Sequence, residues 1–173
     1  MNKLLILNAV IAATFSKTLC AQTVIEPLTP PPELRKYETQ LFNLLDRSEK
    51  TSFDPDVSKS FKSLLEKAPV ADPQLEKKLL TGPAPKGRYV KVEGSRLFYY
   101  TACQAHWCSA TNLAMLFNPN TKEAVGVLKY RCDTYFLNLK NDLQKTWFDA
   151  LNPRHINLEI QKKICDEAKD SKS

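Results

Sequence analysis

The sequence predicts an α+β fold in which an antiparallel β-sheet of about five strands has helices packed before and after it in the chain. Changes of pattern along the chain lead to this class. Apolar residues recur at helical spacing between residues 33 and 80, short runs rich in Tyr, Val and Phe follow between residues 88 and 139, and helical spacing returns from residue 142. The sequence shows no internal repeat and no second domain boundary, so we expect a single domain over residues 33–173.

Residues 1–21 have the layout of a secretory signal peptide. Lys3 gives the start a positive charge, residues 4–15 are mostly apolar, and a short polar segment ends at Ala21. The apolar run is shorter than the roughly 20 residues that cross a membrane. We therefore expect cleavage after Ala21 and secretion of the remainder. The alternatives are a buried N-terminal strand, an uncleaved anchor, and a lipid anchor on Cys20, which the bulky leucine before it disfavours.

The next segment, residues 22–32, is a proline-rich N-terminal arm. Proline has no backbone N–H to donate, so we expect this segment to be exposed and not to form a central strand or the interior of a helix. Helical spacing then predicts three helices, of which the third has Asp72 placed as its N-cap and Gly82 as its stop. The apolar stripe of each helix is assigned to the core. The three cover residues 33–47, 57–67 and 73–80.

Strands are predicted where the apolar period changes. Glu93-Gly94-Ser95 marks a tight hairpin turn between the first two, and Asn118-Pro119-Asn120-Thr121 marks a turn between the third and the fourth. Helices return after the fifth strand. The five strands are expected at residues 88–93, 96–102, 112–117, 123–130 and 134–139, and the last two helices at residues 142–151 and 157–168.

Composition and charge disfavour several classes of function. The net charge is +6 at pH 7 and no dense block of Lys and Arg with interleaved aromatic residues occurs, so we expect no nucleic-acid partner. The chain has only 4 glycines, and it contains no phosphate-binding loop, Gly-x-Ser-x-Gly or His-Glu-x-x-His motif. With 2 histidines and no evident pair of carboxylates, few residues could perform acid–base chemistry. We therefore expect a protein that is not an enzyme and that holds no cofactor.

Loss of Cys20 with the signal peptide leaves four cysteines, an even set that suits an oxidising compartment. Two of them enclose the segment Cys103-Gln104-Ala105-His106-Trp107-Cys108, between the second and third predicted strands. A bond between these two would stabilise folding by only about 2 kcal/mol, so it would chiefly hold a shape. Three other interpretations stay open at this point, namely a metal site formed by Cys103, His106 and Cys108, a redox motif, and a purely structural loop.

Other features surround this loop in a set order. A Gly-Pro stretch precedes the first hairpin, Tyr-Tyr-Thr-Ala-Cys leads into the loop, an apolar strand follows, and then come a glycine-containing strand and a Trp-Phe segment. They lie at residues 82–85, 99–103 and 113–117, at Gly126, and at residues 145–151. In this order, and with the Cys-x-x-His-x-Cys loop, the chain resembles the Ivy family, whose members are periplasmic inhibitors of vertebrate-type lysozymes in Gram-negative bacteria.

The resemblance implies a periplasmic inhibitor of C-type lysozyme, with no catalytic residue and no bound metal. It implies that a Cys103–Cys108 disulfide closes the loop, which leaves Cys132 and Cys165 to pair with each other. In the family the loop histidine enters the active-site cleft and contacts both catalytic carboxylates, and His106 takes that position here. A protonated imidazole donates from both nitrogens, so it can bond to two carboxylates that a retaining glycosidase holds about 5–5.5 Å apart.

The loop also differs from the family's usual one and allows other targets. Gln104 and Ala105 stand where the family has Lys and Pro, and Trp107 is a candidate apolar anchor because tryptophan is enriched in interface hot spots. The same loop could instead block the bacterium's own lytic transglycosylases, and a structural or metal-binding secreted domain is a third interpretation. Family members are known as dimers, so a homodimer is a further hypothesis, although the sequence itself does not indicate the oligomeric state.

Overall fold

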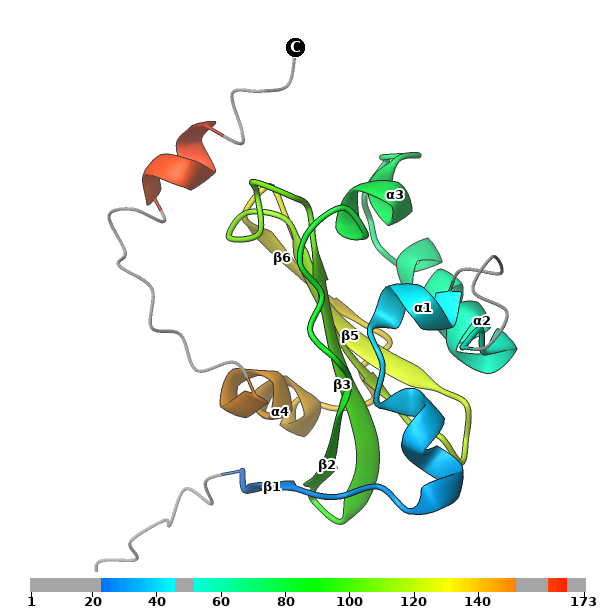
Figure 1. The fold of residues 1–173 in the computed structure, drawn as a ribbon. Helices are drawn as coiled ribbons and strands as arrows, with labels where there is room; N and C mark the ends of the chain where they lie inside the picture. Colours follow the sequence, from blue (N-terminus) through cyan, green and yellow to red (C-terminus); the bar gives the residue numbers. More distant parts are fainter. Residues whose placement is uncertain (1–22, 46–51, 152–161, 168–173) are drawn as a thin grey trace, which may run out of the picture.

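The computed structural model describes residues 23–45, 52–151 and 162–167, and its centre is a six-stranded antiparallel sheet (Figure 1). Each strand pairs with its neighbour in the chain, in the order β1-β2-β3-β4-β5-β6. The predicted α+β class is confirmed, with one strand more than the five expected. The strands are β1 (Ile25–Pro27), β2 (Arg88–Val92), β3 (Ser95–Cys103), β4 (Asn112–Phe117), β5 (Ala124–Tyr130) and β6 (Asp133–Leu137).

The additional strand, β1, comes from the proline-rich segment. The described residues of this segment include both exposed side chains and the buried Pro30, and the segment is not a free arm, because Ile25 lies opposite Val92 of β2. The backbone N–H of Leu28 continues the pairing by donating to Tyr89 O at 2.9 Å. An edge strand needs ladder hydrogen bonds on one side only, so it can accommodate Pro27. The strand has only three residues and one of them is a proline, so the sequence shows no alternation of apolar and polar residues from which the strand could be predicted.

Helices that precede β2 cover one face of the sheet, on the right in Figure 1. The second and third predicted helices are confirmed to within a turn. The first, expected over residues 33–47, is instead two short pieces, because residues 39 and 40 pair with the chain before β2: Gln40 forms a bridge with Lys86, and Gly87 N–H donates to Thr39 O at 2.8 Å. The helices are η1 (Pro32–Tyr37), α1 (Leu41–Leu45), α2 (Pro55–Glu66) and α3 (Leu75–Leu79).

The helix α4 (Leu143–Leu151) packs against the opposite face of the sheet (Figure 1). Residues 162–167 are also helical, which agrees with part of the last predicted helix, and the rest of that prediction lies outside the described residues. The predicted signal peptide, residues 1–21, lies outside them too. Over the ranges that the structure describes, no helix combines the length and the apolar character needed to cross a membrane.

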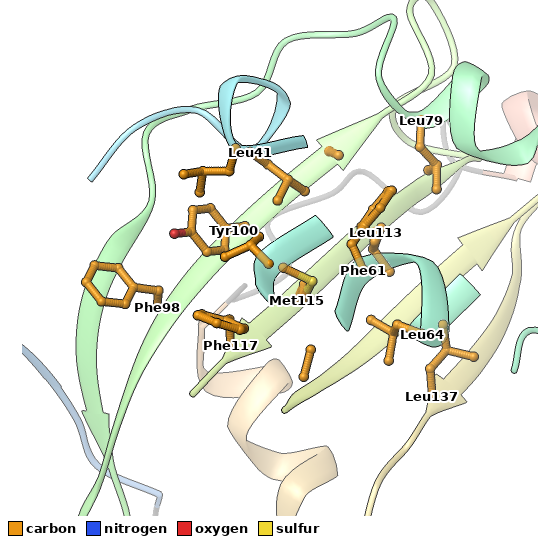
Figure 2. Packing of buried hydrophobic residues seen from close by; sticks show 14 of the residues in the cluster. Leu41, Phe61, Leu64, Leu79, Phe98, Tyr100, Leu113, Met115, Phe117 and Leu137 are labelled. Atoms are coloured by element: carbon orange, nitrogen blue, oxygen red, sulfur yellow. The ribbon is translucent and has the colours of Figure 1, made fainter. Parts of the chain in front are cut away.

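The core divides into two layers because alternate residues of each strand face opposite sides of the sheet. Phe98 and Tyr100 of β3 face the helices that precede the sheet, whereas Tyr99 faces α4. Tyr100 is almost fully buried, and its hydroxyl donates to Tyr37 O at 2.8 Å. Burial raises the pKa of Tyr100 far above its ordinary value, so this donor keeps its proton. Figure 2 shows the helix-side layer, which includes Leu41, Phe61, Leu64, Leu79, Leu113, Met115 and Phe117.

The N-terminus of α2 is fixed by Asp54, a buried carboxylate. Its Oδ1 accepts hydrogen bonds from the N–H groups of Asp56 and Val57, both at 3.1 Å, and its Oδ2 accepts one from Lys36 Nζ at 2.7 Å. Burial alone would raise the pKa of Asp54, but these bonds outweigh it and hold the pKa below its ordinary value. The Asp54 side chain therefore links η1 to α2 on the face of the sheet that these helices cover.

We expect Asp54→Asn to destabilise the fold by about 1 kcal/mol at neutral pH, because the amide keeps the helix cap but loses the charge-assisted bond to the half-exposed Lys36. The pKa of Asp54 is depressed in the folded state, so its contribution is complete above the ordinary pKa, near 4, and is lost as the pH falls below it. Urea unfolding from pH 7 to pH 3 should show the two proteins converge in acid. Asp142→Asn, at a carboxylate that is 93% exposed, is the control and should unfold like the parent. A gap that stays constant with pH would contradict the assignment.

Candidate functional site

The predicted loop joins β3 to β4 at one end of the sheet, and it is closed at its base. Cys103 lies opposite Asn112 in the last strand pair, and Gln104 N–H donates to Thr111 O at 3.0 Å just beyond it. A disulfide joins Cys103 to Cys108, with the two Cα atoms 4.8 Å apart. Because the two sulfurs are bonded to each other, neither is a free thiolate, the form in which cysteine binds a metal.

The tip of the loop is a tight turn that directs one side chain outward. Trp107 N–H donates to Gln104 O at 3.0 Å, which places Ala105 and His106 at the two central positions of a four-residue turn. His106 has a φ of 65°, the value expected at the third residue of a type II turn. Of the six residues from 103 to 108, only His106 is exposed, whereas the others are half-buried or buried.

This exposure distinguishes the two large side chains of the loop. His106 is exposed, while Trp107 is half-buried and its backbone carbonyl accepts from the N–H groups of Ala110 and Thr111, at 2.9 and 2.7 Å. From the sequence, Trp107 is a candidate apolar anchor for a partner. In the structure, Trp107 anchors the descending side of the loop and presents only part of its indole.

A second turn, between β5 and β6, supports the loop from the side of β4. Arg131 and Cys132 have φ values of 48° and 73°, as in a two-residue type I′ hairpin. The N–H of Cys132 donates to Ala110 O at 2.9 Å, and that of Arg131 donates to Thr111 Oγ1 at 3.3 Å. A disulfide links Cys132 to Cys165, as the resemblance implies, and so ties residues 162–167 to this turn. The sequence offers no signal for the role of Thr111, because its partner lies 20 residues away.

Hydrogen bonds to the Asp72 carboxylate fix the N-terminal end of α3. Asp72 accepts hydrogen bonds from Lys78 Nζ at 2.7 Å, from Gln74 N–H at 2.9 Å and from the Tyr130 hydroxyl at 2.9 Å. Burial raises the pKa of Asp72, but these three donors outweigh it, so the net effect is a pKa below the ordinary value. Asp72 thus caps the turn before α3 and holds α3 against the end of β5. Contrary to the prediction, it is not the N-cap of the helix, because α3 begins two residues later than expected, with Gln74 at its N-cap.

A cavity of about 430 Å³ lies beside the disulfide, on the face of the sheet that α4 covers. Both cysteines of the loop border it, together with Thr101 of β3, Phe136 of β6 and Phe148 of α4. The turn residues 104–107 are not part of its wall. The base of the loop therefore borders the cavity, whereas its tip lies outside it.

Comparison with known protein families agrees with this geometry. Residues 56–163 match the family described as inhibitor of vertebrate lysozyme (Ivy), and the matched region includes α2, the strands β2 to β6, the loop and α4. The chain belongs to the Ivy family. Membership implies that this protein is an inhibitor of lysozyme. The matched region is longer than residues 82–151, which carry the motifs of the resemblance. It does not include β1, η1 or α1. No curated protein and no solved structure matches the chain.

Proposed function

We propose that this protein inhibits a C-type lysozyme by inserting the 103–108 loop into the active-site cleft, with His106 between the two catalytic carboxylates. The observation that carries the proposal is the exposure of His106 at the tip of a disulfide-closed turn whose other residues are held by the fold. Membership of the family supports lysozyme as the class of partner, and the exposed histidine supports hydrogen bonding to the carboxylates.

The chemistry follows from the two nitrogens of the imidazole ring. Protonated histidine donates from Nδ1 and from Nε2, and each donor can reach one carboxylate when the pair is about 5–5.5 Å apart. Both bonds are charge-assisted and would form where the sugar ring normally binds, so substrate and inhibitor would exclude each other. A loop that is ordered before binding loses little conformational entropy in the complex, which favours tight association.

The proposal is tested by measuring the inhibition constant of the purified, disulfide-intact protein against hen lysozyme and, in parallel, against a lytic transglycosylase. We expect competitive inhibition of lysozyme. Inhibition of the transglycosylase alone would replace lysozyme with an endogenous target, and inhibition of neither enzyme would contradict the proposal.

We also propose that residues 1–21 are a cleaved signal peptide and that the mature protein is periplasmic. The charged start and the short apolar run support this location, and both disulfides suit an oxidising compartment. Mass spectrometry of the exported protein should give a chain that begins near Gln22, and a retained Met1 would refute it.

A further inference from the structure

The turn that carries His106 is also held by a segment far away in the sequence. Ala105 N–H, next to His106, donates to Thr81 Oγ1 at 3.0 Å, although the two residues are 24 positions apart. The same hydroxyl donates to Lys78 O, in the last turn of α3, at 2.7 Å. The hydroxyl of Thr81 therefore donates a hydrogen bond to α3 and accepts one from the loop, and so connects the two.

Gly82 brings this support into direct contact with the loop. Its N–H donates to Cys103 O at 2.8 Å, beside the disulfide. A Cβ at position 82 would lie 2.5 Å from Cys103 O and 2.8 Å from Cys103 Sγ, so any side chain there would push the backbone of the loop away. Only glycine allows the two backbones to approach this closely.

The support is itself firmly placed. Leu75 and Leu79 of α3 are buried in the helix-side core, and Asp72 binds both Lys78 and Tyr130 of β5. The position of the Thr81 hydroxyl is therefore set by the fold and not by the loop. The loop needs such a restraint, because the left-handed backbone at His106 is unfavourable for a residue with a side chain and persists only where neighbouring structure enforces it.

We propose that Thr81 and Gly82 are positioning residues for inhibition: they hold the Gln104–Ala105 and Cys103–Gln104 peptides, which lead into the turn, in the orientation that His106 needs to enter the lysozyme cleft. The inference rests on the proposed function and adds to it a second restraint, independent of the disulfide. In this chain the 105 position has an N–H that can be held by a hydrogen bond, and the Thr81 hydroxyl is the group that holds it.

The first test is Thr81→Val, which keeps the shape of the side chain and removes the hydroxyl. Loss of one hydrogen bond from the free loop should weaken inhibition of lysozyme about two- to tenfold. Amide exchange at Ala105 should become faster, while the unfolding midpoint should fall only slightly, by about as much as in the Thr146→Val control. Thr81→Ser restores the hydroxyl and should restore both readouts. Thr146→Val is the matched control, because Thr146 donates in the same way to the carbonyl three residues before it, at 2.7 Å, but lies on α4.

The second test removes the same hydrogen bond from the side of the loop. Proline has no N–H, and its ring would meet the Thr81 hydroxyl, which lies 3.0 Å from the nitrogen of residue 105. Ala105→Pro should therefore lose at least as much inhibition as Thr81→Val, and Thr81→Val should cause no further loss in that background. Gly82→Ala should lose more inhibition than Thr81→Val in the parent, because it displaces the loop backbone.

The outcomes separate this inference from the function on which it rests. If His106→Ala loses inhibition but Thr81→Val does not, the positioning role is overturned and the proposed function stands. If neither variant changes inhibition, both fail. Failure of Thr81→Ser to restore inhibition, or an equal loss in Thr146→Val, would also overturn the positioning role, because the effect would then not come from this hydroxyl.

Discussion

Replacement of His106 by alanine should weaken inhibition of lysozyme at least about thirtyfold, the largest functional effect that we expect from one substitution. The variant removes two charge-assisted hydrogen bonds and leaves two enzyme carboxylates desolvated without a partner. Truncation of one member of such a pair costs on the order of 2–5 kcal/mol, and each 1.4 kcal/mol corresponds to about a factor of ten in affinity. The inhibition constant of each variant measures the effect.

The fold should survive this change, because the His106 side chain is exposed at a loop tip. His106→Asn is the sharper companion variant, since asparagine tolerates the left-handed backbone at this position but has too short a side chain to span both carboxylates. It should lose nearly as much inhibition as alanine. His155→Ala removes the other histidine of the chain, which lies outside the described residues, and should change nothing. Unchanged inhibition by a correctly folded His106→Ala protein would refute the loop mechanism.

The largest effect on stability should come from Phe98→Ala, at about 3–5 kcal/mol. Phe98 is completely buried, and its ring packs against Tyr89 at a centroid distance of 4.8 Å and against Tyr37 at 5.1 Å (Figure 2 shows its place in the layer). Truncation would leave a cavity between β2, β3 and η1 that rigid strands cannot fill.

Urea unfolding of both proteins, with intact disulfides, measures the difference in the free energy of unfolding. Phe42→Ala is the control, because Phe42 of α1 is 41% exposed and its truncation should cost much less. A loss of less than about 1 kcal/mol in Phe98→Ala would show that the core can close around the missing ring, contrary to the packing described above.

Most of the sheet could be predicted because its strands carry a local signal. In β3 and β4 alternate residues face the two core layers, and the turn at Glu93 and Gly94 has the positive φ values that its sequence indicates. The break between η1 and α1 could not be predicted in this way. It depends on the pairing of Gln40 with Lys86, a contact between residues 46 positions apart that overrides a continuous helical pattern.

The candidate site shows the same division. The spacing of Cys103, His106 and Cys108 is local, so the loop and its exposed histidine could be proposed from the sequence alone. The groups that hold the loop, Thr81 on one side and the turn at Cys132 on the other, are brought to it only by the folded sheet. Their side chains are ordinary polar residues in the sequence, and nothing in their spacing relates them to the loop.

The neighbour-to-neighbour strand order has a consequence for how quickly the chain can fold. From β2 to β6 every pairing joins strands separated by a short connection, so little loop-closure entropy is lost at each step, and the sheet can grow one hairpin at a time. β1 is the exception, because its partner β2 begins some 60 residues later in the chain. We therefore expect β1 to join last, after η1 and the helices α1 to α3 have docked, and its pairing to contribute to slow unfolding more than to fast folding.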